Sequence, residues 1–120
     1  GGAMVADRTG VATSHALDNL AARGELFVGP GDDVYEGMVV GESARGEEMV
    51  VNVCRAKEKT NIRTHSHDEG VKLAPPVQHT LETAIEWISE DELVEVTPSA
   101  IRIRKRILAE QDRRRLGRKT

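Results

Sequence analysis

The residues best suited to chemistry lie in the segment from Val50 to Val71. It begins as a strand, turns polar near Asn52 and shows no hydrophobic periodicity until Val71. Loops longer than about 12 to 15 residues in a compact domain are usually either functional or disordered. This one is rich in cations and hydrogen-bonding side chains, namely Arg55, Lys57, Lys59, Thr60, Asn61, Arg63, Thr64 and Ser66. Such a composition favours a loop that contacts phosphates and ribose hydroxyls.

One group of metal-ligand types lies in the same segment. It consists of His65, His67 and Asp68, with Cys54 upstream. Two histidines in an extended segment can supply two ligands, but a structural zinc site usually takes four ligands and more sulfur. A solvated loop or an RNA contact is therefore the favoured interpretation. Basic neighbours could lower the thiol pKa of Cys54, yet a small buried side chain at a strand end is its favoured role.

No catalytic motif accompanies the loop. The sequence contains no GxxxxGK[ST] phosphate loop, no GxSxG elbow and no HExxH zinc motif. Gly29–Gly31 precedes a strand rather than a helix, so it predicts a turn. The acidic run Glu90–Glu92 lacks surroundings that would separate the pKa values of two catalytic carboxylates, so it predicts a solvated turn. The sequence therefore predicts no enzyme activity, no cofactor and no metal in these residues.

Length and composition favour one domain. The chain has 120 residues and a mass of 13.1 kDa. Aromatic residues make up 2% of it, so the core must be aliphatic and stacking platforms for single-stranded nucleic acid are not expected. One cysteine fits a reducing compartment, and without a signal-like segment or an apolar run of about 18 residues we expect a cytosolic monomer with no membrane contact.

The domain boundaries follow from the two ends of the sequence. Gly1–Met4 resembles a cloning remnant, so residues 1–8 are set aside as remnant and linker. Residues 9–116 are assigned to the domain, and residues 117–120 to a disordered tail.

Charge is unevenly distributed along the chain. Residues 54–72 carry a net charge of +2 and residues 98–120 carry +7, whereas residues 1–53 and 73–97 each carry −6. This separation indicates a polyanion partner better than the overall pI of about 5.8 does.

A second basic group lies near residues 101–106. Ile101 and Ile103 alternate with arginines, which predicts a strand with a basic face opposite the core. The cations are Arg102, Arg104, Lys105 and Arg106. An ordered basic face can bind phosphates at fixed spacing. An exposed strand followed by a solubilising tail is an equal alternative.

The hydrophobic pattern predicts two packing helices. The first runs from Thr13 or Ser14 through Arg23, with Gly24 as its C-terminal stop. The second follows Thr80 and has an apolar stripe at helical spacing, formed by Leu81, Ala84, Ile85 and Ile88. Trp87 lies off this stripe, where it either flanks the core, the favoured interpretation, or meets a neighbouring domain.

Strands are expected at residues 26–28, 34–40, 49–53, 71–73, 93–96 and 101–103. The polar residues 42–48 suit a hairpin loop, and the chain looks helical after Lys105. Together these elements predict an α+β fold with a mixed or antiparallel sheet, two packing helices and one long basic loop.

Four segments, taken together and in this order, resemble one known family. They are Leu26–Met38 (LFVGPGDDVYEGM), Thr60–Arg63 (TNIR), Asp91–Pro98 (DELVEVTP) and Ile101–Arg106 (IRIRKR). They resemble the C-terminal domain of the BipA/TypA translational GTPases, which are relatives of elongation factor G. The resemblance runs from Thr9 to Arg115.

The resemblance implies a family-specific fold that binds the ribosome, with a long loop reaching the peptidyl transferase centre and the acceptor end of A-site tRNA. The positions that match this RNA-binding loop are Arg55, Lys57, Lys59, Thr60, Asn61, Ile62, Arg63 and Ser66. The implied partners are the ribosome, rRNA, tRNA and the other domains of the same GTPase. GTP and Mg would belong to the full-length family protein, which acts in stress adaptation and large-subunit assembly. The alternative is an intramolecular interaction domain that packs on the GTPase body without direct RNA contact.

Overall fold

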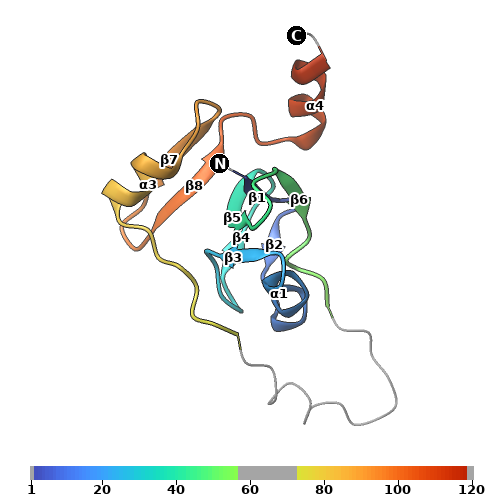
Figure 1. Cartoon of the computed structure of the whole chain (residues 1–120), viewed down its shortest axis with the longest axis vertical. Coiled ribbons are helices and arrows are strands. Elements are labelled where there is room, and N and C mark those ends of the chain that lie inside the picture. Colours follow the sequence, from blue (N-terminus) through green and yellow to red (C-terminus); the bar gives the residue numbers. More distant parts are fainter. Residues whose placement is uncertain (1, 57–72, 119–120) are drawn as a thin grey trace.

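A computed structural model describes residues 2–56 and 73–118 and has an α+β fold, as the sequence predicts (Figure 1). Its elements are β1 (Ala3–Ala6), β2 (Gly10–Val11), α1 (Ser14–Ala21), β3 (Gly24–Leu26), β4 (Asp33–Val34), β5 (Met38–Ser43), β6 (Met49–Val51), α3 (Leu81–Trp87), β7 (Glu92–Val96), β8 (Ile101–Lys105) and α4 (Glu110–Arg118). In this part of the chain no helix is long and apolar enough to cross a membrane.

A six-stranded mixed sheet organises the domain. Its order is β6-β1-β5-β8-β7, and β3 also pairs with β5. Among the described strands, the β1–β6 pairing alone is parallel, and the other pairings of this sheet are antiparallel. Strands β2 and β4 form a separate small ribbon.

The prediction that residues 1–8 are a cloning remnant and linker is wrong. Residues Ala3–Ala6 form β1, which lies inside the sheet between β5 and β6. All four residues are buried, because the sheet is covered on both faces. Met4 is completely buried at the centre of the domain.

The two faces of the sheet carry separate apolar clusters, since successive strand residues point to opposite sides. Met4, Val40 and Leu17 belong to the cluster on the α1 side. Val5 and Ala84 belong to the cluster on the α3 side. Figure 1 shows α1 and α3 as separate helices at different parts of the sheet.

Helix α1 begins where the sequence predicts. The Thr13 hydroxyl oxygen accepts a hydrogen bond of 3.1 Å from the Ala16 backbone N–H, which caps the helix. Gly24, however, is the first residue of β3 and not the helix stop. A Cβ at Gly24 would lie 2.0 Å from the Glu42 carbonyl oxygen, so the close approach of β3 to β5 explains this glycine.

The predicted strand at 34–40 is divided in two. Gly37 has a φ of +93°, and this left-handed residue separates β4 from β5. Strand β5 then continues to Ser43. The predicted hairpin at 42–48 is also wrong, because β1 lies between β5 and β6.

Other strand boundaries shift by a few residues. The strand expected at 26–28 is β3, and the one expected at 49–53 ends at Val51. Leu73 is not in a strand, and residues 71–72 lie outside the described residues. The strands expected at 93–96 and 101–103 correspond to β7 and β8.

Helix α3 confirms its predicted cap and part of its predicted stripe, because Ala84 is buried and Ile88 packs against the core. The Thr80 hydroxyl accepts from the Thr83 N–H, and the Thr83 hydroxyl accepts from the Thr80 N–H. Leu81 and Ile85 are 42% and 56% exposed. Trp87 instead packs on the core, edge-on to Phe27 with 5.4 Å between ring centroids, as its favoured interpretation predicts.

Helix α4 follows the sheet and lies at one end of the molecule (Figure 1). It runs to Arg118, so residues 117 and 118 are helical and not part of a disordered tail. The rest of the expected tail, residues 119–120, lies outside the described residues.

Candidate nucleic-acid interface

The basic loop leaves the body beside the N-terminus of α1. The Thr13 N–H donates to the Val53 carbonyl oxygen at 2.9 Å, and the Thr13 hydroxyl donates to the Arg55 carbonyl oxygen at 2.7 Å. Thr13 therefore both caps α1 and holds the chain that enters the loop. Arg55 is exposed just beyond this attachment.

The chain rejoins the body on the same apolar cluster. Leu73 packs against the α1-side cluster, as does Cys54 at the other end of the loop. Further on, the Val77 N–H donates to the Leu26 carbonyl oxygen at 2.8 Å. Both ends of the loop are thus tied to the body.

Most of the predicted loop contacts cannot be placed. Lys57, Lys59, Thr60, Asn61, Ile62, Arg63 and Ser66 lie outside the described residues, as do His65 and His67. Within residues 2–56 and 73–118, no group of three or more His, Cys, Asp or Glu side chains could hold a metal ion.

Cys54 lies half-buried at the base of the loop. Burial raises the pKa of its thiol, and the nearby Arg8 guanidinium offsets this only in part. A Cβ at Gly10 would lie 2.9 Å from the Cys54 sulfur, so this neighbour packs closely on the side chain. The structure thus favours a packed thiol over a reactive thiolate, as the sequence does.

Arg102 and Arg104 lie on the face of β8 opposite Ile103 and α3. Both are half-buried. Arg102 pairs across the sheet with Glu95, whose carboxylate accepts a 2.6 Å hydrogen bond from the Tyr35 hydroxyl. An acidic side chain therefore accompanies this part of the predicted basic face.

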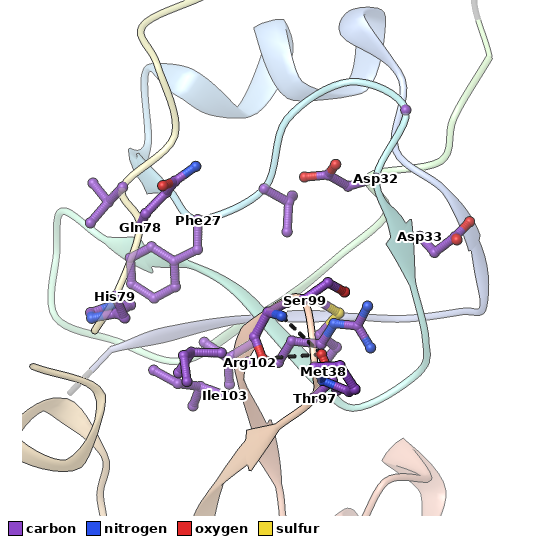
Figure 2. A pocket seen from close by; sticks show the side chains of 17 residues that line it. Phe27, Asp32, Asp33, Met38, Gln78, His79, Thr97, Ser99, Arg102 and Ile103 are labelled. Carbon is purple, nitrogen blue, oxygen red and sulfur yellow. Dashed lines mark hydrogen bonds between the residues drawn. The ribbon is translucent and has the colours of Figure 1, made fainter. Parts of the chain in front are cut away.

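Arg102 also lines a cleft of about 700 Å³ (Figure 2). The cleft lies where β3 and β8 separate along β5, since β8 pairs with Met38 and Val39 whereas β3 pairs with Gly41–Ser43. Apolar side chains line part of it, and Asp32, Gln78, His79 and Ser99 are among its polar residues. A concave surface of mixed character surrounds Arg102, in place of an open basic strand.

Lys105 does not belong to an exposed basic face. Its side chain is 2% exposed, and its ammonium lies 2.8 Å from the Asp91 carboxylate and 2.9 Å from the Glu92 carboxylate. The Glu48 carboxylate contacts it as well. Burial by itself would lower the pKa of Lys105, but hydrogen bonds to these carboxylates outweigh it and raise the pKa above its usual value.

The same contacts correct the interpretation of the acidic run. Glu92 is 2% exposed in its side chain and forms a buried ion pair, so only part of the run is solvated. The signal was present in the strand alternation, because Lys105 follows Ile101 and Ile103 at spacings of two and shares their buried face. Its partner could not be found without the β7–β8 register, which places Glu92 opposite Lys105.

Arg106 is the exposed cation at the end of β8. Its Nε donates to the Glu90 carbonyl oxygen at 2.8 Å, which fixes the guanidinium at the β7–β8 end. An arginine has five N–H donors, so this single bond leaves donors for another acceptor.

Comparison with known proteins identifies close relatives. A family model described as the TypA/BipA C-terminal domain matches residues 1–110. The large ribosomal subunit assembly factor BipA of Escherichia coli strain K12 is 49% identical over 117 residues, covering 98% of this chain and 19% of that protein. Proteins of the same name from Salmonella typhimurium and Haemophilus influenzae are 48% and 44% identical, again with 19% of their length covered.

The extent of these matches defines what the 120 residues contain. They span 19% of the length of these curated relatives, and the matching family model is a C-terminal domain. The GTPase domain expected of the full-length family protein is therefore not in this chain, and neither is a GTP site.

Proposed function

Because the chain belongs to the TypA/BipA C-terminal domain family, we propose that it is a ribosome-docking module that binds the large subunit through its basic loop. The curated relatives are named large ribosomal subunit assembly factors, which makes the ribosome the expected partner. On the family resemblance, the loop contacts rRNA and the acceptor end of A-site tRNA. The module would act in the cytoplasm as a monomer, within a protein whose GTPase domain binds GTP and Mg.

The observation that carries this proposal is the attachment of both loop ends. Thr13 holds the entry through the Val53 and Arg55 carbonyl oxygens, and Leu26 holds the return through Val77. The described residues that enter and leave the loop are therefore attached to the folded body. Because these flanking residues are already ordered, binding through the loop would not carry the entropic cost of ordering them.

The distribution of charge along the chain also supports the proposal. The loop and the C-terminal region carry net positive charge, whereas the rest of the chain is acidic. An acidic body would be repelled by RNA, so the cationic loop would orient the domain as it approaches. Lys105 takes no part in this proposal, because its ammonium already contacts three carboxylates.

The test is the affinity of the chain for purified large ribosomal subunits as a function of salt. Lys59→Ala with Arg63→Ala removes two loop cations, and Arg23→Ala with Arg45→Ala removes two exposed arginines elsewhere as a matched control. Each lost phosphate contact should lower the slope of log K against log salt by about 0.7 to 0.9 units. A loop variant that stays folded and binds with the parent's affinity and slope would refute the assignment.

The second candidate function is an intramolecular interaction domain, which one observation favours. Leu81 and Ile85 are four residues apart on α3 and lie on the same side of the helix. They are 42% and 56% exposed, so α3 presents apolar surface that another part of the full-length protein would cover. Cross-linking from residue 85 of the full-length protein separates the candidates: adducts to its other domains support an interdomain face, and their absence removes it.

A further inference from the structure

Helix α4 has no apolar face to bury. Its nine residues, Glu110–Arg118, include a single large apolar side chain, Leu116, which is 47% exposed. Its other residues include four arginines and two acids. A short helix is marginal in water by itself and normally depends on packing an apolar stripe. The order of α4 must therefore come from polar contacts.

Those contacts fix the start of the helix. The Glu36 carboxylate accepts a 3.0 Å hydrogen bond from the Glu110 N–H, which is favourable at a helix N-terminus. Arg113 donates from Nη1 to the carbonyl oxygens of Ile107 and Leu108 at 2.9 and 2.6 Å. Polar contacts to the β4–β5 connection and to the preceding chain thus set the direction of α4.

Gly37, next to Glu36, explains how closely the chain before α4 approaches the body. A Cβ at Gly37 would lie 2.7 Å from the Leu108 backbone, so only glycine allows the chain before α4 to approach so closely. The approach and the Glu36 contact lie at adjacent residues. The start of α4 is therefore held against residues 36 and 37 and is not connected to the body through β8 alone.

Beyond this attachment α4 presents arginines to solvent. The side chains of Arg114 and Arg115 are 70% and 67% exposed. Their ion-pair partners are Glu110 and Asp112 of the same helix. Exposed pairs of this kind contribute little and are readily exchanged. A guanidinium matches a phosphate with two parallel hydrogen bonds, so both side chains are suited to a nucleic-acid backbone.

The helix and the described ends of the loop lie far apart. In Figure 1 α4 stands at one end of the long axis, while the chain that follows β6 and the chain that precedes α3 extend toward the opposite end. The described ends of the loop and helix α4 therefore belong to different parts of the surface. A contact through α4 in addition to one through the loop would help to fix the orientation of the domain on a large surface.

We propose that α4 is a second RNA-binding element, in which Arg114 and Arg115 grip phosphates without reading base sequence. This inference rests on the proposed function and deepens it, because it adds a contact to the same partner through a separate element. Glu110 and Asp112 hold the two guanidinium groups until phosphates replace them.

The test measures binding of the whole chain to purified large ribosomal subunits across a salt series. Arg114→Gln with Arg115→Gln removes two charges and keeps good helix formers in place. Arg23→Gln with Arg45→Gln, at exposed positions near the far end of β5, is the matched control. Loss of two phosphate contacts should lower the salt slope by about 1.4 to 1.8 units and weaken binding at 0.1 M salt on the order of 30-fold.

The loop variant Lys59→Ala with Arg63→Ala separates this inference from the proposed function. If both the loop and α4 variants weaken binding and the control does not, both stand. If only the loop variant weakens binding, the α4 inference is overturned and the loop assignment stands. If only the α4 variant does, α4 binds RNA and the loop assignment fails. If neither does, or if the control weakens binding equally, α4 is not a specific contact. Circular dichroism verifies that each variant retains the parent's helix content.

Discussion

Replacing Lys105 by Met should strongly destabilise the domain. The substitution removes a buried ammonium and leaves Glu92, with a side chain 2% exposed, without its counter-charge. Breaking a buried pair by deleting one partner costs about 3 to 5 kcal/mol. The lower end applies here because Asp91 and Glu48 are 64% and 45% exposed and can return to water. We therefore expect a loss of about 3 kcal/mol, or roughly 12 °C in Tm for a domain of this size.

The double variant Lys105→Met with Glu92→Met identifies the cause. Because it removes both buried charges, it should recover to within about 1 kcal/mol of the parent. Urea denaturation followed by circular dichroism measures both variants. A single variant that loses less than about 1 kcal/mol, or a double variant no more stable than the single one, would refute the buried ion pair.

The same pair predicts a pH dependence and a binding result. Because the folded-state pKa of Lys105 lies above its unfolded value of about 10.4, its contribution is complete below about pH 10 and is lost as pH rises further. Under conditions where it stays folded, Lys105→Met should bind large ribosomal subunits as tightly as the parent does. Weaker binding would restore Lys105 to the predicted RNA-contact set.

Further predictions concern Tyr35, Gly37 and Thr13. Burial and the hydrogen bond to Glu95 raise the pKa of Tyr35, which is the chain's only tyrosine. Tyrosinate absorbance should therefore appear only above the usual pKa of about 10, together with unfolding. Titration of Tyr35 near pH 10 in the folded protein would contradict this. Gly37→Ala should lower the free energy of unfolding, measured by urea denaturation, by about 2 to 4 kcal/mol, because φ at Gly37 is +93° and Leu108 leaves no room for a Cβ. An unchanged free energy of unfolding would exclude this close approach of Leu108 to Gly37. Thr13→Ala should lower the free energy of unfolding by about 1 to 2 kcal/mol and weaken ribosome binding. Thr13→Ser keeps the hydroxyl and should have neither effect. Equal stability and binding of the two variants would exclude the helix cap.

Local signals predicted the elements that local chemistry determines. Thr13 and Thr80 mark helix starts because a hydroxyl cap needs only its own next turn. The alternation at residues 101–103 predicted β8, because a strand at a sheet surface has a period of two, and a strand was also predicted at residues 93–96, where β7 lies. The four family segments were specific enough to identify the family, which the match over residues 1–110 confirms.

Features that depend on long-range pairing could not be predicted. The sequence does not predict strand β1, because Gly-Gly-Ala-Met resembles a remnant and has no strand signal of its own. The place of β1 between β5 and β6 comes from pairing with distant residues. The stripe on α3 overestimated burial, because helical spacing cannot say that Trp87 rather than Ile85 meets the sheet. The anchoring of α4 by Glu36 joins residues 74 positions apart and has no sequence signal.

The most direct test of the account is photo-cross-linking from residue 61 of the full-length protein bound to ribosomes. Asn61 lies within the family-matching TNIR segment of the basic loop. A photoreactive amino acid at this position should give adducts with rRNA or tRNA, whereas the same group at residue 85 on α3 should not. Adducts from residue 61 only to the protein's own domains would contradict ribosome docking through the loop.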